Sequence, residues 1–461
     1  MRFLPVDRRP AVAVIGFGYV GSCISATLAD RGYDVIAIDT DERLPEELAR
    51  GFFRLEEPGL SELVFSGLES GRLRVTTDFA ETAAADVILI CVGTPVRDDG
   101  SLFDEQLRGA CRALRAHLRP EQLVVLKSTV PPGTTRHIVL PELEAGGLRC
   151  GVDFGLAVTP ERLAEGTALA ELRTFPIAAG GYDEDSVRDV TEFWRTALAV
   201  EVVRLDSLET AEIVKLASNW WIDLNIALAN ELAKFCALHG VDVLDVVSAA
   251  NMIPKGKGMV NILLPSVGVG GSCLTKDPWM VWKSAKQRGV DIRTAAVGRE
   301  VNTDMPEYAA QLIIDELLRQ GKDPERSTVG VLGLSFKNNT GDLRTTPTLG
   351  TVKALAKVGI TVRVHDPLVD ADKVRAMFGI EPSATVEDTV RQVDCVAVLA
   401  LHQQFADIDF GALPVAERCI VFDGRAYYPK AHVEQLIAAG YVYRGIGRGS
   451  ALGDPSHGEA R

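Results

Sequence analysis

Closely spaced cysteines are missing from this sequence. Its eight cysteines lie singly along the chain, and no two of them form a Cys-x-x-Cys pair. Zinc-binding motifs and disulfide scaffolds depend on such spacing, so we expect neither a metal site nor a disulfide framework. Single cysteines within apolar runs are typical of small core side chains. We therefore expect a reducing, cytoplasmic setting.

Long apolar runs and an excess of positive charge are missing as well. No stretch approaches the roughly 18 apolar residues that cross a bilayer, so we expect neither a membrane span nor a targeting segment. The 63 acidic side chains outnumber the 49 basic ones, which gives a net charge of −14. A surface of this sign repels phosphate, and we expect no nucleic-acid or membrane partner. A phosphate-bearing ligand would need a small pocket with local positive charge.

The first third of the chain alternates short apolar runs with helical patterns. With 461 residues, 47% of them hydrophobic, the chain can form two or three globular domains. The apolar runs predict buried parallel strands at residues 12–15, 35–38, 87–92, 123–127 and 154–158. Strands that alternate with helices in this way are typical of a doubly wound α/β sheet.

The pattern changes to one long helix over residues 208–239, a stretch without Pro or Gly. At 1.5 Å per residue this helix would extend roughly 45 Å, which is too long for one small core. We interpret it as a connector and a dimer interface, with a buried helix of a monomer as the alternative. Beyond it we expect a second α/β domain, with a helix at 346–358 and strands at 328–332, 361–365, 395–400 and 419–422.

A glycine fingerprint follows the first predicted strand. Gly16, Gly18 and Gly21 have the G-x-G-x-x-G spacing, and Asp39 ends the next strand about twenty residues later. Gly16 would permit the tight turn, Gly18 the approach of a pyrophosphate, and Gly21 close packing of helix on sheet. A carboxylate at position 39 would bind ribose hydroxyls and repel the extra phosphate of NADP. This context predicts an NAD site.

Two further loops follow predicted strands of the same sheet. One contains Gly93, Thr94 and Pro95, and the other spans residues 128–134. Ligands of parallel sheets lie beyond the carboxyl ends of the strands, so both loops are expected at the nicotinamide half of the cofactor site. For either loop alone, an ordinary turn is the alternative.

One cysteine differs from the other seven. Cys273 follows three glycines in the segment 268–271 and precedes Lys276 and Asp277. A backbone this open would let a substrate reach the sulfur, and nearby positive charge favours the thiolate, which is the nucleophile. We therefore predict that Cys273 is a catalytic nucleophile.

The order of these motifs resembles the UDP-glucose/GDP-mannose dehydrogenase family, over nearly the full chain. The resemblance is carried by the glycine fingerprint and by the segments 57–60, 93–95, 127–135, 160–166, 214–216 with Asn219, 268–277, 333–337 and 423–425. It implies an α/β fold with two Rossmann-like doubly wound domains joined by a long-helix dimerisation region. The expected divisions are an NAD-binding domain (1–205), a central helical domain with the cysteine loop (206–305), a nucleotide-sugar domain (306–448) and a disordered tail (449–461).

The resemblance also implies a four-electron oxidation of C6 of an NDP-hexose, through a thiohemiacetal and a thioester on Cys273. Lys215 would stabilise the oxyanions, with Asn219 as a hydrogen-bond donor. Asp277 and Thr129 would hold the water that removes the first proton. Glu161 would position or deprotonate the water that attacks the thioester.

Binding residues follow from the same resemblance. The cofactor would meet Gly16, Gly18, Tyr19, Val20, Gly21, Asp39, Arg43, Gly93, Thr94, Pro95, Thr129, Glu165 and Lys276. The NDP-hexose would meet Glu161, Arg162, Leu163, Lys215, Asn219, Lys257, Gly270, Phe336, Lys337 and Arg425. The resemblance further implies a homodimer or a higher homo-oligomer.

The substrate signals conflict. Val269 and the Pro278-Trp279 pair resemble relatives that oxidise UDP-N-acetylhexosamines, whereas Ser272 and Met259 resemble the glucose type. We favour UDP-glucose or TDP-glucose, with a UDP-N-acetylhexosamine as the alternative. A two-electron hydroxyacid-type dehydrogenase is a competing class, but it explains neither the Cys273 loop nor the second α/β domain. A protein that binds the nucleotide sugar without turnover is a third possibility.

Overall fold

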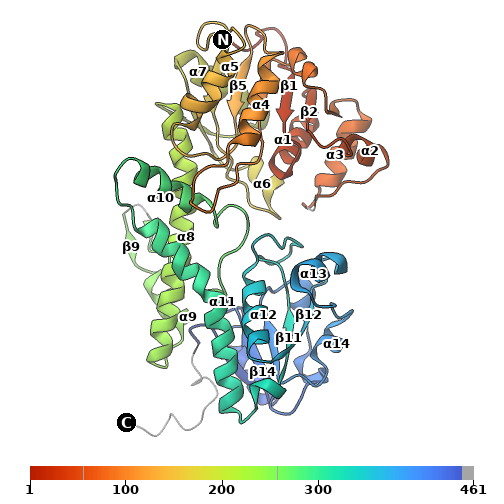
Figure 1. Cartoon of the computed structure of the whole chain (residues 1–461), viewed down its shortest axis with the longest axis vertical. Helices are drawn as coiled ribbons and strands as arrows, with labels where there is room; N and C mark the ends of the chain where they lie inside the picture. Colours follow the sequence, from red (N-terminus) through yellow and green to blue (C-terminus); the bar gives the residue numbers. More distant parts are fainter. Residues whose placement is uncertain (56, 257, 407, 449–461) are drawn as a thin grey trace. The chain divides into compact units, whose positions relative to one another are not determined.

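The structure is a computed structural model that describes residues 1–55, 57–256, 258–406 and 408–448 (Figure 1). The predicted tail at 449–461 and the predicted substrate residue Lys257 lie outside the described residues. The chain divides into two compact units, each described by itself below. Unit 1 comprises Met1–Ser218 and Trp279–Asp291, and unit 2 comprises Asn219–Pro278 and Ile292–Arg461.

Unit 1 is built on an eight-stranded sheet with the strand order β3-β2-β1-β4-β5-β6-β7-β8. All neighbouring strands pair in parallel except β6 and β7, which are antiparallel. The strands are β1 (Val12–Ile15), β2 (Val35–Ile38), β3 (Leu73–Thr76), β4 (Val87–Ile90), β5 (Leu123–Leu126), β6 (Gly155–Val158), β7 (Ile177–Gly181) and β8 (Val202–Leu205).

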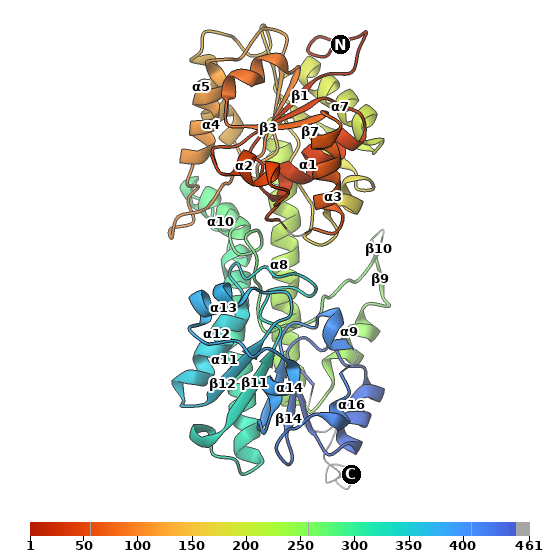
Figure 2. The same ribbon diagram turned by 90° about the vertical axis from the view of Figure 1, so that its right-hand side faces the viewer.

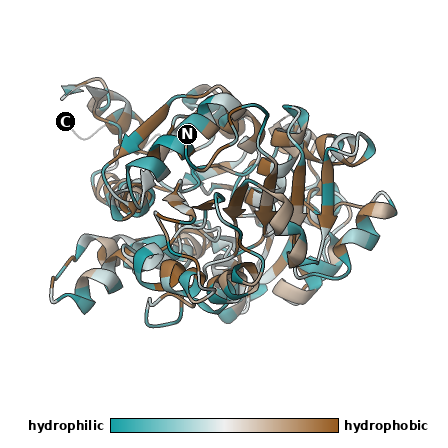
Figure 3. Ribbon diagram, turned by 90° about the horizontal axis from the view of Figure 1, so that it is seen from above, coloured by the Kyte–Doolittle hydropathy of each residue, from teal (hydrophilic) through white to brown (hydrophobic). Residues whose placement is uncertain are grey.

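Helices cover both faces of this sheet. Along β1, Val12 and Val14 belong to one buried cluster, while Ala13 and Ile15 belong to another. A strand that is buried on both faces needs a continuous apolar run, which is why these segments stand out in the sequence. In Figure 3 the hydrophobic colour concentrates on such strands. The helices are α1 (Tyr19–Asp30), α2 (Leu44–Ala49), α3 (Leu60–Glu69), α4 (Glu105–Arg115), α5 (Leu140–Glu144), α6 (Ala168–Leu172) and α7 (Glu184–Leu198).

The long helix α8 spans Leu208–Leu238, within one residue of the predicted range (Figure 2). The boundary between the two units falls inside it, after Ser218. It is followed by α9 (Val243–Ala250), the short strands β9 (Pro254–Lys255) and β10 (Gly258–Met259), α10 (Asp277–Gln287) and α11 (Thr294–Arg319). Within the described ranges, no helix is both long enough and apolar enough to cross a membrane.

Unit 2 contains a five-stranded, fully parallel sheet with the order β12-β11-β13-β14-β15. Its strands are β11 (Thr328–Leu332), β12 (Thr361–His365), β13 (Cys395–Val398), β14 (Ile420–Asp423) and β15 (Val442–Gly445). Its remaining helices are α12 (Pro347–Lys357), α13 (Ala371–Phe378), α14 (Val386–Val390), α15 (Gln403–Ala406) and α16 (Lys430–Ala438). The predicted α/β class with two Rossmann-like sheets is confirmed.

Candidate functional site

The glycine fingerprint forms a tight turn between β1 and α1. Gly16 has φ +98°, and a Cβ atom there would lie 2.7 Å from the carbonyl oxygen of Cys91. A Cβ on Gly21 would overlap the carbonyl oxygen of Gly16. Gly18 differs, because a Cβ there would meet no atom within 4 Å. Two glycines thus permit the packing, and the third leaves open space at the start of α1.

The surroundings of this open space fit a dinucleotide. Helix α1 has no side-chain cap at its N-terminus, so its first backbone N–H groups can bind an anion. Asp39 is half-buried at the end of β2, and its carboxylate accepts hydrogen bonds from the N–H groups of Phe17 (2.7 Å) and Asp41 (3.0 Å). A carboxylate has about four acceptor positions, so both oxygens can still accept bonds from ribose hydroxyls. These residues fit NAD.

Tyr19 connects the start of α1 to Glu57 and, through it, to the segment that leads into α6. Its hydroxyl donates to Glu57, which is 6% exposed and also accepts from the N–H groups of Gly166 (2.6 Å) and Ala168 (2.8 Å). Burial and this hydrogen bond raise the pKa of the Tyr19 hydroxyl. Glu57 was not predicted as a site residue, although it lies in a segment that carried the resemblance.

The other predicted cofactor residues have different surroundings. Val20 is partly buried against the core of unit 1. Arg43 is exposed and pairs with Asp41 at 2.9 Å. Glu165 is half-buried in the segment that follows β6. Lys276 belongs to unit 2, where its ammonium lies 2.6 Å from the carboxylate of Asp277.

The loops after β4 and β5 are bonded to each other. The Thr94 hydroxyl donates to the carbonyl of Thr129 (2.7 Å), and the Ser128 hydroxyl donates to the carbonyl of Val92 (2.7 Å). Gly93 lies against Gln106, whose Oε1 atom would be 2.5 Å from a Cβ at that position. Both loops lie at the carboxyl ends of their strands, so the structure brings together two segments that sequence analysis placed near the nicotinamide.

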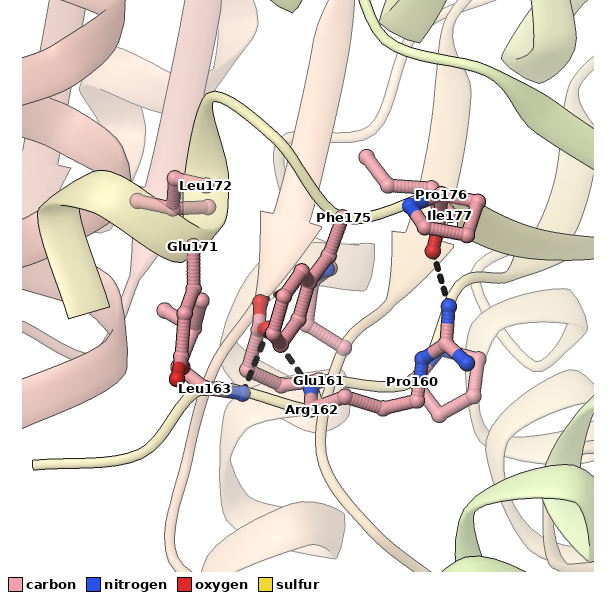
Figure 4. Close-up of a pocket in the computed structure, with 10 residues that line it drawn as sticks. Pro160, Glu161, Arg162, Leu163, Glu171, Leu172, Phe175, Pro176 and Ile177 are labelled. Atoms are coloured by element: carbon pink, nitrogen blue, oxygen red, sulfur yellow. Dashed lines mark hydrogen bonds and ion pairs between the residues drawn. The ribbon is translucent and has the colours of Figure 1, made fainter. Parts of the chain in front are cut away.

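Glu161 lies in a pocket of unit 1, and both oxygens of its carboxylate have polar partners. One oxygen is 2.9 Å from the ammonium of Lys127, which is 2% exposed. The other oxygen accepts from the N–H groups of Arg162 (2.7 Å) and Leu163 (3.2 Å), as Figure 4 shows. Lys127 also lies 5.0 Å from the ring centre of Trp194. Lys127 was not predicted as a site residue, because its partner Glu161 lies in another loop of the chain.

The pocket around Glu161 is lined by predicted substrate residues and by the segment that leads into β7. Arg162 extends away from Glu161, and its guanidinium donates to the carbonyl of Pro176 (Figure 4). Phe175 and Leu163 contribute the apolar part of the lining. The pocket thus combines one buried cation, the carboxylates of Glu161 and Glu171, and an apolar wall.

Cys273 is the one exposed cysteine, since Cys91 is half-buried and the other six are buried. Its carbonyl accepts from the N–H groups of Lys276 (3.2 Å) and Asp277 (2.9 Å), which forms the turn into α10. The Ser272 hydroxyl lies 3.9 Å from the sulfur. The predicted accessibility of this sulfur is therefore confirmed.

Asp277 is fully buried behind the Cys273 turn. Its carboxylate accepts from the side-chain amide of Asn219 (2.5 Å) and lies 2.6 Å from the Lys276 ammonium. Lys215 precedes Asn219 by one turn of α8 and is 7% exposed. Residues four apart lie on the same face of a helix. The structure thus joins Asn219, Asp277 and the cysteine turn, and places Lys215 on the same face of α8 as Asn219.

Glycines of the cysteine loop pack against the loop after β11. A Cβ on Gly270 would overlap the side chain of Phe336 and lie 2.8 Å from the carbonyl of Thr345. The carbonyl of Phe336 in turn accepts from the guanidinium of Arg425. Three predicted substrate residues therefore meet in unit 2, and Lys337 is the half-buried neighbour of Phe336.

A buried polar network supports the segment that leads into the cysteine loop. The Arg299 guanidinium lies 2.6 Å from Asp223, and the Asn302 amide donates to the same carboxylate (2.9 Å). Asn230 donates to Asn302 (2.9 Å) and accepts from the N–H group of Ser266 (2.8 Å). This network joins α8, α11 and residue 266. Sequence analysis did not predict it.

Comparison with known proteins identifies the family of the chain. Three domains of the UDP-glucose/GDP-mannose dehydrogenase family match in order: the NAD-binding domain at residues 10–198, the central domain at 209–304 and the UDP-binding domain at 330–430. The cofactor that the first of these domains binds is NAD, as the glycine turn predicts.

Individual relatives cover almost the whole chain. The UDP-N-acetyl-D-mannosamine dehydrogenase of Pyrococcus horikoshii is 32% identical over 95% of this chain and 99% of its own length. The UDP-glucose 6-dehydrogenase AglM of Haloferax volcanii is 33% identical over 90% of this chain and 96% of its own length. A UDP-glucose dehydrogenase structure from Pyrobaculum islandicum superposes with a TM-score of 0.84 at 32% identity, over 96% of this chain and 99% of that one. The chain belongs to the UDP-glucose/GDP-mannose dehydrogenase family.

Proposed function

We propose that this protein oxidises C6 of a UDP-N-acetylhexosamine to the uronic acid, in a four-electron reaction that uses two NAD and passes through Cys273. The observation that carries the proposal is the exposed sulfur of Cys273, at the end of a glycine loop and one turn from the buried Asp277. A two-electron dehydrogenase has no need for such a thiol.

The sulfur solves a specific chemical problem. An aldehyde is a poor hydride donor, but its thiol adduct is again an alcohol-like centre with a C–H bond at C6. Addition of the Cys273 thiolate to the C6 aldehyde therefore gives a thiohemiacetal that can be oxidised to a thioester. Attack by water then releases the carboxylate and returns the thiolate. NAD, when bound, accepts the hydride from C6 in each of the two oxidations.

We assign to the polar residues the roles that the family resemblance implies. Lys215 supplies positive charge to the oxyanion that forms at C6, and Asn219 fixes the orientation of Asp277. Asp277 and Thr129 hold the water that takes the first proton. Glu161, bonded to Lys127 and to two backbone N–H groups, orients the water that attacks the thioester.

The choice of sugar rests on the relatives and on two sequence features. Relatives named UDP-N-acetyl-D-mannosamine dehydrogenase are 32–35% identical to this chain, and two named UDP-glucose 6-dehydrogenase are 30–33% identical. These relatives favour the N-acetylhexosamine over the glucose-type substrate that sequence analysis preferred. Val269 and Pro278-Trp279 agree with them, whereas Ser272 keeps UDP-glucose as the second candidate.

Counting NADH per sugar tests the four-electron reaction. We expect two NADH for each sugar consumed, with a higher kcat/KM for UDP-N-acetylmannosamine or UDP-N-acetylglucosamine than for UDP-glucose or TDP-glucose. One NADH per sugar would favour the two-electron rival. Ligand-dependent thermal stabilisation without turnover would favour a binding protein. A higher kcat/KM for UDP-glucose would restore the glucose assignment.

Replacing the sulfur tests its role directly. We expect Cys273→Ala to abolish uronate formation while the Kd for NAD stays within about twofold of wild type, because the thiol reacts only with the sugar. Ser272→Ala is the matched control on the same loop, and we expect it to retain two NADH per sugar. Uronate formation at the wild-type rate by Cys273→Ala would remove the thioester from the mechanism.

We also propose that α8 mediates a homodimer. Trp221, Leu228 and Phe235 follow one another at seven-residue intervals, and their exposed fractions are 50%, 52% and 59%. This spacing places three large apolar side chains on one face of the helix, as in helices that pair. A second copy of the chain offers the same stripe, so two copies can cover each other around a twofold axis.

Light scattering at micromolar concentration tests this interface. We expect the mass of a dimer, or of a multiple of it, for the wild-type chain. Leu228→Glu should yield monomers, since it places a charge in the centre of the stripe. The control is Val290→Glu, because Val290 is equally exposed (54%) but lies outside α8. A monomeric wild-type chain would contradict the proposal.

A further inference from the structure

Three loops converge at the carboxyl edge of the five-stranded sheet. They follow the neighbouring strands β11, β13 and β14. The first one contains residues 335–339, which we call the nucleotide loop because Phe336 and Lys337 belong to it. In parallel sheets this edge is where ligands bind. The conformation of the nucleotide loop therefore determines how Phe336 and Lys337 are presented.

Hydrogen bonds join the nucleotide loop to residues 401–403 after β13. The side chain of Asn338 accepts from the N–H group of Leu401 (3.0 Å), and that of Asn339 accepts from the N–H group of Gln403 (2.7 Å). Between them, the backbone N–H group of Asn339 donates to Nδ1 of His402 (2.9 Å). His402 thus occupies the centre of this contact.

The hydrogen-bond partners of His402 determine its tautomer. Nδ1 accepts from a backbone N–H group and so carries no proton. Nε2 lies 3.0 Å from Oδ2 of Asp366 and therefore carries the proton, which it donates to the carboxylate. The Ser335 hydroxyl is 3.5 Å from the same nitrogen. His402 is 0% exposed, so both ring nitrogens are shielded from bulk solvent.

Asp366 extends the contact to the start of the loop. Its Oδ2 atom also accepts from the N–H groups of Leu334 (2.7 Å) and Ser335 (3.3 Å), and its Oδ1 atom accepts from Leu368 (2.9 Å). The nucleotide loop is consequently held at both ends by one Asp-His pair. Asp366 holds the entry at residues 334–335, and His402 holds the exit at residue 339.

The exit of the loop needs this support because Asn339 has φ +58°. Non-glycine residues seldom adopt this left-handed conformation, although Asn tolerates it better than most. Asn339 forms two bonds there, one from its N–H group to His402 and one from Gln403 to its side chain. Without the imidazole acceptor, the left-handed residue loses the bond that fixes its backbone.

We propose that His402 is a positioning residue for the nucleotide. Its Nε2-protonated imidazole holds the nucleotide loop in the conformation in which Phe336 and Lys337 meet the nucleoside diphosphate of the substrate. Arg425 supports the same loop from the β14 side, by donating to the carbonyl of Phe336. This inference rests on the proposed function, since it assumes a nucleotide sugar as substrate.

Calorimetric titration of UDP into the full-length protein tests the proposal with two variants that divide the bonds. His402→Asn retains an acceptor near the position of Nδ1, and His402→Gln retains a donor near that of Nε2. We expect Kd for UDP to rise about tenfold in His402→Gln, because the Asn339 N–H group loses its acceptor, and about threefold in His402→Asn. The control is His432→Gln, since His432 is a half-buried histidine of the same unit, stacked on Tyr428.

Steady-state kinetics distinguish a misplaced nucleotide loop from a general disruption of the fold in the His402 variants. In His402→Gln we expect KM for the nucleotide sugar to rise about tenfold, with kcat and KM for NAD within about twofold of wild type. A Kd for UDP within twofold of wild type in both variants would overturn this inference alone. A wild-type protein that does not bind UDP would overturn the proposed function and this inference with it. Equal losses in kcat and in NAD affinity would show structural damage and would also overturn it.

Discussion

In each unit, the first strand of the sheet along the chain is followed by the same kind of turn. In unit 1, Gly16 (φ +98°) directly follows β1, and the next N–H group donates to Asp39 at 2.7 Å. In unit 2, Gly333 (φ +82°) directly follows β11, and the next N–H group donates to Asp366, also at 2.7 Å. Each aspartate directly follows the strand that pairs with β1 or β11, respectively. The same turn, a glycine with positive φ followed by an N–H group that donates to an aspartate, therefore lies at the ligand-binding edge of both sheets.

The turns diverge immediately afterwards. In unit 1, open space at Gly18 leads directly into α1, and Asp39 is half-buried. In unit 2 a longer loop precedes α12, and Asp366 is buried under His402. The first turn leaves its helix N-terminus and carboxylate open to a dinucleotide. In the second turn the carboxylate is instead bonded to His402 and to backbone N–H groups of the same unit.

Among the substitutions that test this comparison, those of the glycines should have the largest effects, and these effects are on the free energy of unfolding. We expect Gly16→Ala and Gly333→Ala each to lower the free energy of unfolding by about 3 kcal/mol, because both have positive φ and their Cβ atoms would meet the carbonyls of Cys91 and Ala400. Gly18→Ala is the control. It should change stability by less than about 0.5 kcal/mol and raise Kd for NAD about tenfold. Urea denaturation and NAD titration measure both quantities, and equal stability losses at all three positions would contradict this.

Replacing either aspartate by asparagine should have a smaller effect. This effect is on the NAD/NADP ratio of kcat/KM, and it should differ between the two turns. We expect Asp39→Asn to lower the NAD/NADP ratio of kcat/KM about tenfold, since a carboxylate at the ribose repels the extra phosphate. Asp366→Asn should leave that ratio unchanged. Steady-state kinetics with both cofactors measure the ratio. An unchanged ratio in Asp39→Asn would exclude a ribose contact for this residue.

The smallest effect should be the response of the second turn to acid. Burial alone would raise the pKa of Asp366, but the hydrogen bond from His402 and those from the N–H groups of Leu334 and Leu368 outweigh it, so the pKa is lowered. An aspartate whose pKa is lower in the folded than in the unfolded chain stabilises the fold at pH values above its unfolded pKa of about 3.9. This stabilisation is lost as the pH falls through the pKa of the folded state. We expect stability to decline less steeply below about pH 4 in Asp366→Asn. Urea midpoints between pH 3 and pH 6 check this, and parallel curves would disagree with it.

The sequence predicted the buried parts of the sheets well. Strands β1, β2, β11 and β12 have the predicted bounds. Strands β1 and β2 are buried along their whole length, and a strand covered on both faces needs an uninterrupted apolar run. Strands β3 and β8 were not predicted; both are partly exposed and carry arginine, as β12 does. Strand β7 escaped because its Ile-Ala-Ala-Gly-Gly sequence has little of the β-branched character of strands.

Site residues were predictable where a local motif carries the chemistry. The glycine spacing identified the turn at Gly16, and the glycines before Cys273 identified an accessible thiol. Lys127, Glu57 and His402 act through partners in other loops, and in the case of Glu57 and Gly166 the partners are 109 residues apart. Only the folded sheet, which gathers its loops at one edge, brings such pairs together.

The contrast between Cys273 and the other thiols makes this chain simple to label. Burial raises the pKa of Cys111 and of Cys419 to about 12, and it raises the pKa of Cys23, Cys236 and Cys395 as well. Thiols of this kind react slowly with electrophiles such as iodoacetamide. Mass spectrometry of the folded, alkylated protein should therefore find one adduct per chain. A fluorescent or spin-bearing reagent would thus attach at a single defined point, the sulfur at the end of the glycine loop.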